Sequence, residues 1–364
     1  MVDQLDNIIG QPHAVNQLKS LVRNNRIPHA LIFSGQSGVG KFYSAIQFIK
    51  TINQAKDYSK IEQFEEPLVK LILPLPRGKN EVNESSGTEK LTDKQLDDLK
   101  KEILKKQKNL FYKIQLDGAN NIKISSIREV RKFLSIEYSD IKYRAVIIED
   151  AHLMNKESQN ALLKSLEEPP QGVIFILLTS NEDWLLSTIL SRCWKVQFKS
   201  LSFDIITEIL ESKFKIEKES ASKAALFSEG SVTQGLNLVE NEMISLIDST
   251  IKFMRYSLGG WYNSAYNELK TATDDFNRSK VFEVMKLVNI WLTDTRRNKL
   301  DYQFYYFHDY PDTLEKFNKS FPNAKIDELI KEIDELIESM DKNILLNVII
   351  LNLILKLNFI LTRK

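Results

Sequence analysis

The 364-residue sequence predicts an α/β domain over residues 1–200 and an all-α remainder. Four short apolar runs rich in branched residues, typical of buried strands, lie at 29–34, 112–116, 143–148 and 173–179. Helical patterns lie between them at 40–51, 125–134 and 155–168, and strand-like runs cease after residue 200. Strands that alternate with helices pair in parallel and carry helices on both faces of the sheet.

Residues 55–110 are predicted to form an insertion on this core. The stretch 77–90 is polar, with two glycines and two serines, and indicates a loose loop. Thr92 then begins a charged helix in which Gln95 is placed for a capping box. The apolar positions of this helix recur at helical spacing: Leu96, Leu99, Ile103 and Leu104.

The all-α remainder divides into two predicted parts. Residues 201–244 predict three short helices, and residues 245–364 read as helical to the end, with the last helix at 343–361. Breaks are expected at Gly259–Gly260, Tyr310–Pro311 and Phe321–Pro322. Asparagines and a lysine interrupt the apolar stretch 344–361. A membrane-spanning helix needs about 20 mostly apolar residues, so a buried helix of a bundle is predicted instead.

The charges nearly cancel, with 50 Lys+Arg against 49 Asp+Glu. A chain so balanced has no overall field that draws it to nucleic acid, so any DNA contact is local or shared with other subunits. The single cysteine, Cys193, excludes an internal disulfide and a cysteine-based zinc site. The first residues carry acids and lack a secretory signal pattern, and a cytoplasmic protein is expected.

A glycine-rich motif, GQSGVGK, stands between a predicted strand and a predicted helix at residues 35–41. Gly35, Gly38 and Gly40 would let backbone N–H groups surround phosphates, and Lys41 would reach the outer ones. The alternative is a glycine-rich turn without a ligand. The next position calls for a Ser or Thr hydroxyl that binds Mg²⁺, but the residue there is Phe42, whose ring has no oxygen.

Two acids, Glu149 and Asp150, end the strand-like run at 143–148. Carboxylates at this place beside a phosphate loop hold Mg²⁺ and orient the attacking water. The alternative is a solvated acidic turn without a catalytic role. The sequence therefore predicts a nucleotide site whose phosphate cradle remains while its metal ligand at position 42 is missing.

Four further motifs carry a family resemblance. In order they are IIGQ at 8–11, RIPHA at 26–30, NALLKSLEEP at 160–169 and TILSRC at 188–193. With the phosphate loop, they resemble the AAA+ clamp-loader family of bacterial DNA polymerase III, and within it the delta-prime type of subunit. The resemblance implies a RecA-like core over 1–200, a small helical lid over 201–244 and a helical collar, used for oligomerisation, over 245–364.

The resemblance also implies roles for single residues. In this family the Ser-Arg-Cys motif supplies an arginine finger, which would be Arg192 here, completing the ATP site of a neighbouring subunit. A guanidinium suits that role, because it offers a permanent charge and a rigid donor fork. The alternative for Arg192 is a surface salt bridge. Asn181 falls at the family's sensor strand end, where it would contact phosphate or water, and Cys193 is predicted to be a packing residue.

Departures from the family pattern concentrate in the nucleotide site. Active members carry Asp then Glu where this chain has Glu149 then Asp150, and an arginine in the lid where this chain has Gln234. Members often carry a four-cysteine zinc module, which one cysteine cannot build, so no metal site is expected. No cofactor is required; weak binding of ATP or ADP stays open, since the loop glycines and Lys41 are present.

The expected function is that of a non-hydrolysing stator subunit in a hetero-oligomeric clamp loader. Its expected partners are the gamma/tau and delta subunits, the sliding clamp and, through the complex, primer–template DNA. The resemblance thus places it in a DNA-directed polymerase holoenzyme, a nucleotidyltransferase, without ATP hydrolysis of its own. The alternatives are an ATP-hydrolysing motor subunit of gamma/tau type and an unrelated P-loop interaction protein.

DNA contact is expected at the start of one helix, if this subunit touches DNA directly. Ser125, Ser126 and Arg128 open the helical pattern at 125–134. Serine hydroxyls, helix N–H groups and arginine together could contact a DNA backbone without reading its sequence. The alternative is an ordinary helix start with exposed charges.

Overall fold

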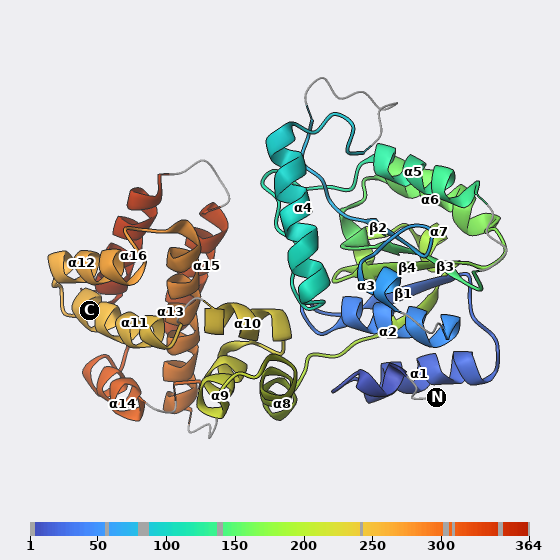
Figure 1. Ribbon diagram of the computed structural model, residues 1–364. Helices are drawn as coiled ribbons and strands as arrows, with labels where there is room; N and C mark the ends of the chain where they lie inside the picture. Colours follow the sequence, from blue (N-terminus) through green and yellow to red (C-terminus); the bar gives the residue numbers. More distant parts are fainter. Residues whose placement is uncertain are drawn as a thin grey trace. The chain divides into compact units, whose positions relative to one another are not determined.

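The computed structural model describes residues 4–54, 58–78, 87–136, 141–240, 243–300, 306–307, 310–340 and 345–362. The chain divides into two compact units, Met1–Leu236 and Asn237–Lys364 (Figure 1). The boundary lies inside the last of the three helices predicted for the lid. The division into three parts at residues 200 and 244 stays a prediction.

The first unit is built on a five-stranded sheet in the order β2-β3-β4-β1-β5. Every pair of neighbouring strands is parallel, with Ile32 opposite Leu177 and Ile147 opposite Ile176. The strands are β1 (Ala30–Ser34), β2 (Val69–Ile72), β3 (Arg144–Ile148), β4 (Val173–Thr179) and β5 (Trp194–Gln197). The parallel α/β class predicted from the sequence is confirmed.

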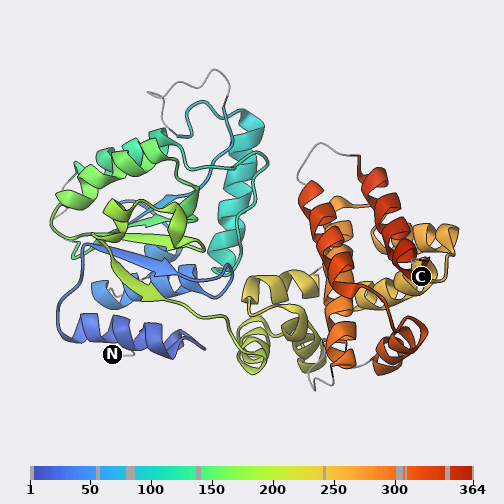
Figure 2. The ribbon, with the colours of Figure 1, turned by 180° about the vertical axis from the view of Figure 1, so that it is seen from behind.

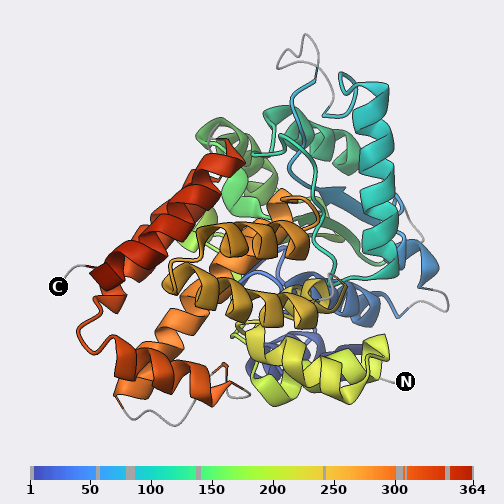
Figure 3. The same ribbon diagram turned by 90° about the vertical axis from the view of Figure 1, so that its left-hand side faces the viewer.

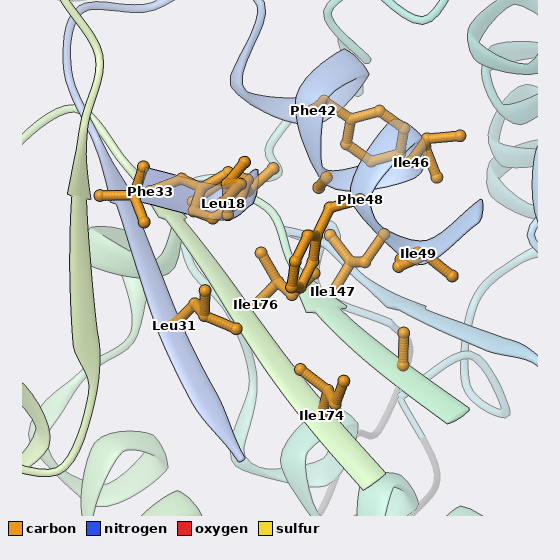
Figure 4. Packing of buried hydrophobic residues seen from close by; sticks show 14 of the residues in the cluster. Leu18, Leu31, Phe33, Phe42, Ile46, Phe48, Ile49, Ile147, Ile174 and Ile176 are labelled. Carbon is orange, nitrogen blue, oxygen red and sulfur yellow. The ribbon is translucent and has the colours of Figure 1, made fainter. Parts of the chain in front are cut away.

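Helices cover both faces of this sheet, as Figures 1 and 2 show from opposite sides. Side chains alternate along each strand, so that Leu31 and Phe33 enter one core while Ala30 and Ile32 enter the other. Helices α1 (Pro12–Arg23) and α2 (Lys41–Asn53) pack on the first face, and α5 (Ile124–Leu134) and α6 (Lys156–Glu167) on the second. In Figure 4, Ile147, Ile174 and Ile176 point toward the apolar side chains of α2.

Three of the four predicted strands are confirmed, and the fourth, at 112–116, is wrong. That segment has no strand partner: the N–H of Gln115 donates to a carboxylate oxygen of Glu102 (2.9 Å) instead of to a strand. The strand beside β3 is β2, at Val69–Ile72. The predicted insertion at 55–110 therefore includes a strand of the core sheet. The short edge strand β5 was not predicted.

The long helix of the predicted insertion is α4 (Asp93–Lys108). Its capping box is confirmed, because Thr92 and Gln95 exchange hydrogen bonds through side chain and backbone. Leu99 packs with Leu73, Leu75 and Leu91 in a small cluster of its own. This cluster attaches α4 to the segment after β2.

The remaining short elements of the first unit lie at its start, between strands and in the lid. They are the 3-10 helices η1 (Gln4–Asn7), η2 (Ala151–Leu153) and η3 (Glu182–Trp184), and the helices α3 (Ser59–Glu62), α7 (Ser187–Leu190), α8 (Phe203–Phe214) and α9 (Lys218–Phe227). Helix α10 (Val232–Glu240) begins in the first unit and ends in the second. The three helices predicted over 203–240 are confirmed.

Every regular element described in the second unit is a helix (Figure 3). Its helices are α11 (Met243–Leu258), α12 (Tyr262–Ala272), α13 (Arg278–Lys299), α14 (Pro311–Ser320), α15 (Ile326–Ser339) and α16 (Leu346–Thr362). The three predicted breaks fall between helices or at their ends; the start of the last predicted helix, 343–344, lies outside the described residues. Among the residues that are described, no helix has the length and apolarity to cross a bilayer.

Candidate functional site

The glycine-rich motif joins the carboxyl end of β1 to the start of α2, as its sequence context predicted. Gly38 has φ +79°, and a Cβ atom there would come 1.9 Å from Ser231 Oγ, so a larger residue would clash with the lid. Gly40 has φ +91° and caps α2. Both positions lie in the left-handed region that favours glycine. The phosphate loop is therefore present as a backbone structure.

Lys41 is turned back onto its own loop. Its ammonium group donates to the carbonyl oxygens of Gly35 (2.5 Å) and Gln36 (2.6 Å). Burial lowers the pKa of Lys41 to about 8, against the opposing effect of the Asp150 carboxylate. The hydrogen bonds that this lysine would make to phosphate oxygens are thus made to the loop itself.

Phe42 stands where the motif calls for a metal-binding hydroxyl, and it is a core residue. Its side chain is 5% exposed and packs edge-on against Phe64, with ring centroids 5.3 Å apart. In Figure 4 the ring lies beside Ile46 on the apolar face of α2. The position therefore contributes packing and no oxygen.

Lys106, near the end of α4, meets the first of the two acids. Its Nζ atom lies 2.7 Å from Glu149 Oε1, and the two side chains are only 3% and 14% exposed. The same ammonium donates to the carbonyl of Tyr112 (2.6 Å) and lies 4.1 Å from the centroid of the Phe42 ring. A buried ion pair with a cation–π contact thus stands beside the phosphate loop.

A catalytic Mg²⁺ does not fit these residues. Mg²⁺ needs oxygen ligands in near-octahedral geometry. Phe42 offers none, and the facing oxygen of Glu149 is already paired with Lys106. Among the described residues, no group of three or more His, Cys, Asp or Glu side chains could hold a metal ion.

The second acid, Asp150, also faces a lysine. Its carboxylate lies 3.4 Å from Lys113 Nζ. His152, two residues on, lies 3.3 Å from the hydroxyl of Thr179 through Nδ1, and burial lowers the pKa of its ring. These contacts tie the acidic strand end to its surroundings, and burial of the His152 ring favours its uncharged form.

The space left at the phosphate loop is small. The cavity there has a volume of about 50 Å³, whereas sites for small ligands are typically about 300–1,000 Å³. A neighbouring space of about 440 Å³ is lined by Glu149, Asp150 and the segment 113–117, but by no residue of the phosphate loop. The residues lining the small cavity include Gly38, Gly40, Lys41, Phe42, Lys106, Phe111, Glu149 and Asp150.

Two predicted nucleotide contacts, Gly35 and Asn181, lie outside that lining, and so does Gln234, which stands where active family members carry a lid arginine. Asn181 caps η3, where its side-chain oxygen accepts from the N–H of Asp183 (3.2 Å). Gln234 lies in the first turns of α10, and its N–H donates to Ser231 Oγ (3.2 Å). The lid residue that reaches the cavity is Thr233.

Arg192 follows the short helix α7 and forms an ion pair on the surface. Its guanidinium lies 2.9 Å from Glu167 Oε1 and donates to the carbonyl of Thr188 (3.0 Å). The side chains of Arg192 and Glu167 are 36% and 49% exposed. Exposed ion pairs contribute little stability, so a stronger anion can displace this carboxylate at small cost.

The predicted DNA contact needs correction. Ser125 and Ser126 are each 3% exposed, so their hydroxyls cannot reach a DNA backbone. Gly87 covers this helix start: its N–H donates to Glu129 (2.6 Å), and a Cβ on Gly87 would come 2.5 Å from Ser126 Oγ. Of the three predicted residues, only Arg128 is exposed.

Cys193 packs at the edge of the second core as a partly buried residue. Burial raises the pKa of its thiol to about 12. A thiol in that state is a poor nucleophile, because the thiolate is the reactive form. Its position agrees with the predicted packing role.

The parallel sheet, the phosphate loop and the helical lid together define a core of the AAA+ clamp-loader class. The chain belongs to the family described as DNA polymerase III, delta subunit, whose model matches residues 10–202, more than half of its length. The sequence resemblance to clamp-loader proteins is thereby confirmed at the level of the family.

Curated relatives carry other subunit names from the same polymerase. The chain is 26% identical to DNA polymerase III subunit tau of Bacillus subtilis, over 69% of this chain and 38% of the relative. It is 31% identical to subunit gamma of Buchnera aphidicola subsp. Acyrthosiphon pisum, over 65% of this chain and 57% of the relative. The chain thus spans 38% to 57% of the length of these two relatives.

Two solved structures are similar over most of this chain. A DNA polymerase III gamma subunit-related protein of Thermotoga maritima is 15% identical, with a TM-score of 0.47, covering 93% of this chain and 97% of that one. The clamp loader delta protein of Bacillus subtilis is 11% identical, with a TM-score of 0.32, covering 94% and 99%.

Proposed function

We propose that this chain is a non-hydrolysing subunit of a DNA polymerase III clamp loader, of delta-prime type, and that Arg192 completes the ATP site of a neighbouring subunit. The observation that carries the proposal is the buried ion pair between Lys106 and Glu149 beside Phe42. Family membership and the gamma and tau relatives support a place in that complex.

Hydrolysis by this chain is disfavoured at each step that the chemistry needs. Phosphoryl transfer depends on positioned cations and an oriented water. Here the carboxylate at the strand end is neutralised by Lys106, and the lid carries Gln234 in place of a cation. The acids also stand in the reverse order, and a misplacement of about 1 Å can cost on the order of a hundredfold in rate.

Arg192 has the chemistry and the exposure for a role outside its own subunit. Its side chain is 36% exposed, and its partners are the surface carboxylate of Glu167 and the carbonyl of Thr188. A neighbour's triphosphate carries more negative charge than Glu167. Its oxygens can accept two parallel N–H hydrogen bonds from the guanidinium group. Exchange of Glu167 for that phosphate would then accompany assembly.

The proposed partners are the gamma/tau and delta subunits, the sliding clamp and primer–template DNA. The near-zero net charge of +1 argues for DNA contact through the assembled complex. The competing function, an ATP-hydrolysing motor subunit, is favoured by the names of the relatives. It is opposed by the residues at the metal position. The third alternative, an unrelated P-loop protein, is excluded by family membership.

ATP turnover tests the proposal. The isolated chain should show no turnover above background with Mg²⁺ present; robust turnover would favour the motor function. In a mixture with motor subunits, clamp and primed DNA, Arg192→Ala should lower turnover at the site it completes by about a thousandfold or more. The total ATP turnover of the complex would then fall by the amount that the site completed by Arg192 contributes.

A matched control lies three residues away. Lys195→Ala also removes a surface cation, one whose Nζ lies 2.6 Å from Glu182. It should leave the rate of the complex unchanged. If Arg192→Ala behaves like Lys195→Ala, Arg192 has no role in the neighbour's site.

A further inference from the structure

The segment from Lys106 to Tyr112 lies against the phosphate loop, the acidic strand end and the lid. We infer that this segment is a built-in occupant of the chain's own nucleotide site. It supplies a cation at the metal position and an aromatic bridge between core and lid, so that the lid is held without any nucleotide. This inference goes beyond the proposed function and does not depend on Arg192.

The cation is the first part of the occupant. The Lys106 ammonium has a carboxylate oxygen, a carbonyl oxygen and an aromatic ring as neighbours, from Glu149, Tyr112 and Phe42. These partners satisfy its charge in a place where the side chain is 3% exposed. A divalent ion could take the Oε1 atom of Glu149 as a ligand only if this ammonium left, which would strand a buried charge.

The aromatic bridge is the second part. The ring of Phe111 stacks on Tyr43 of α2, with centroids 5.1 Å apart, and meets Phe214 of α8 edge-on at 6.0 Å. Its carbonyl accepts a hydrogen bond from the Thr233 hydroxyl of α10 (2.6 Å). A Cβ atom on Gly40 would come 3.2 Å from this ring. One residue thus joins the phosphate loop, a core helix and two lid helices.

The occupant is fixed at both ends. The N–H of Phe111 donates to Asn109 Oδ1 (2.9 Å), just after the end of α4. Tyr112 donates its hydroxyl to Glu102 (2.7 Å), whose carboxylate also accepts from the N–H of Gln115 (2.9 Å). The small cavity of about 50 Å³ is what remains around it. A nucleotide would have to displace the whole segment.

Hydrogen exchange of the lid amides shows whether the aromatic bridge holds the lid. Hydrogen exchange of the amides in α8 and α10 should be equally slow in the wild-type chain with and without Mg-ATP. Phe111→Ala removes the stack and the edge contact, and lid amides should then exchange about tenfold faster. Thr233→Val keeps the shape of its side chain and removes one hydrogen bond, and it should give a smaller acceleration of the same amides.

A matched control separates this effect from general loss of stability. Phe133→Ala truncates another phenylalanine with little exposure, 4% against 8% for Phe111, in the core on the opposite face of the sheet. It should leave lid exchange at the wild-type rate. If Phe111→Ala and Thr233→Val both leave lid exchange unchanged, the bridge does not hold the lid.

Nucleotide binding tests whether the segment from Lys106 to Tyr112 occupies the nucleotide site. The wild-type chain should show no saturable binding of a fluorescent ATP analogue at millimolar Mg²⁺, and the double variant Lys106→Met/Phe111→Ala should bind it. Tight binding of Mg-ATP by the wild-type chain, with slower lid exchange, would overturn the inference. That result would leave the role of Arg192 standing, whereas an Arg192→Ala complex of normal rate would remove that role and leave the occupant in place.

Discussion

A lysine ammonium and a magnesium ion are different partners for Glu149. Lys106 carries one charge on a flexible stem and donates hydrogen bonds, whereas Mg²⁺ carries two charges and holds oxygen ligands in a fixed geometry. The ammonium therefore neutralises the carboxylate without supplying the second charge or the fixed ligand geometry of a metal ion. A single side chain from α4 thus pairs with the carboxylate oxygen that a metal ion would need as a ligand.

Cys193 offers a test of burial beside the arginine motif. Its thiol pKa is raised from 9.0 to about 12, so the thiolate fraction at pH 8 falls by about a thousandfold. We expect Cys193 in the folded chain to react with a disulfide reagent about a thousandfold more slowly than in urea. Absorbance of the released thiol at pH 8 measures both rates.

An exposed cysteine provides the comparison for that measurement. Ser191 is an exposed neighbour, so Ser191→Cys in a Cys193→Ser chain should react at the rate of an ordinary thiol. Fast modification of the native Cys193 in the folded chain would show that the thiol is accessible and ionised, contrary to its position in the structure.

Among the elements, local signals predicted the core well. The run at 173–179 became β4 with the same bounds, and Thr92 and Gln95 cap α4 as their spacing requires. The run at 112–116 has the same local pattern but no strand partner, because the neighbouring position beside β3 belongs to β2. Which apolar run enters a sheet is decided by tertiary pairing, which local pattern does not encode.

The candidate site shows the same limit. The loop glycines, Lys41 and both acids were predicted from motif and strand position. Lys106 was missed, since a lysine in a basic helix end is usually solvated, and its contact with Glu149 spans 43 residues of sequence. The burial of Ser125 and Ser126 under Gly87 likewise depends on long-range packing.

Helix α13 carries a buried acid that should make the second unit sensitive to pH. Asp294 is 0% exposed, and its carboxylate accepts from the N–H of Phe307 (2.8 Å). Burial raises its pKa from 3.8 to about 6. Its contribution to stability is therefore fully present below about pH 4 and is lost as pH rises through 6, a change on the order of 3 kcal/mol.

The variant Asp294→Asn removes this titration and should flatten the pH dependence. Relative to the wild type, it should gain stability steadily between pH 4 and pH 7, apart from a constant offset for the altered hydrogen bonds. Urea unfolding followed by tryptophan fluorescence gives the free energy at each pH; Trp291 lies on the same helix. Parallel pH curves for the two chains would mean that Asp294 has an ordinary pKa.

For the whole molecule, the two units present different surfaces. In the first unit, the segment from Lys106 to Tyr112 lies over the phosphate loop, and Arg192 is exposed on the surface. The second unit exposes an apolar stripe at helical spacing on α16, where Val348, Leu351 and Leu355 are 48%, 51% and 54% exposed. The opposite face of α16, with Leu353 and Leu357, is buried in the unit. A helix that is apolar on both faces at a surface indicates a place where another chain packs.

We expect the exposed apolar stripe of α16 to contact another subunit on assembly. Leu351→Gln/Leu355→Gln should leave the stability of the isolated chain within about 0.5 kcal/mol, because both side chains are already exposed. The dissociation constant of the complex between this double variant and the motor subunits should rise about tenfold or more for each leucine lost from the interface. Sedimentation of the mixed subunits measures this, with Asn352→Gln, an exposed polar change on the same helix, as control. If the double variant assembles as tightly as the control, the subunit contact lies elsewhere on the chain, and the exposed leucines of α16 are only a feature of its surface.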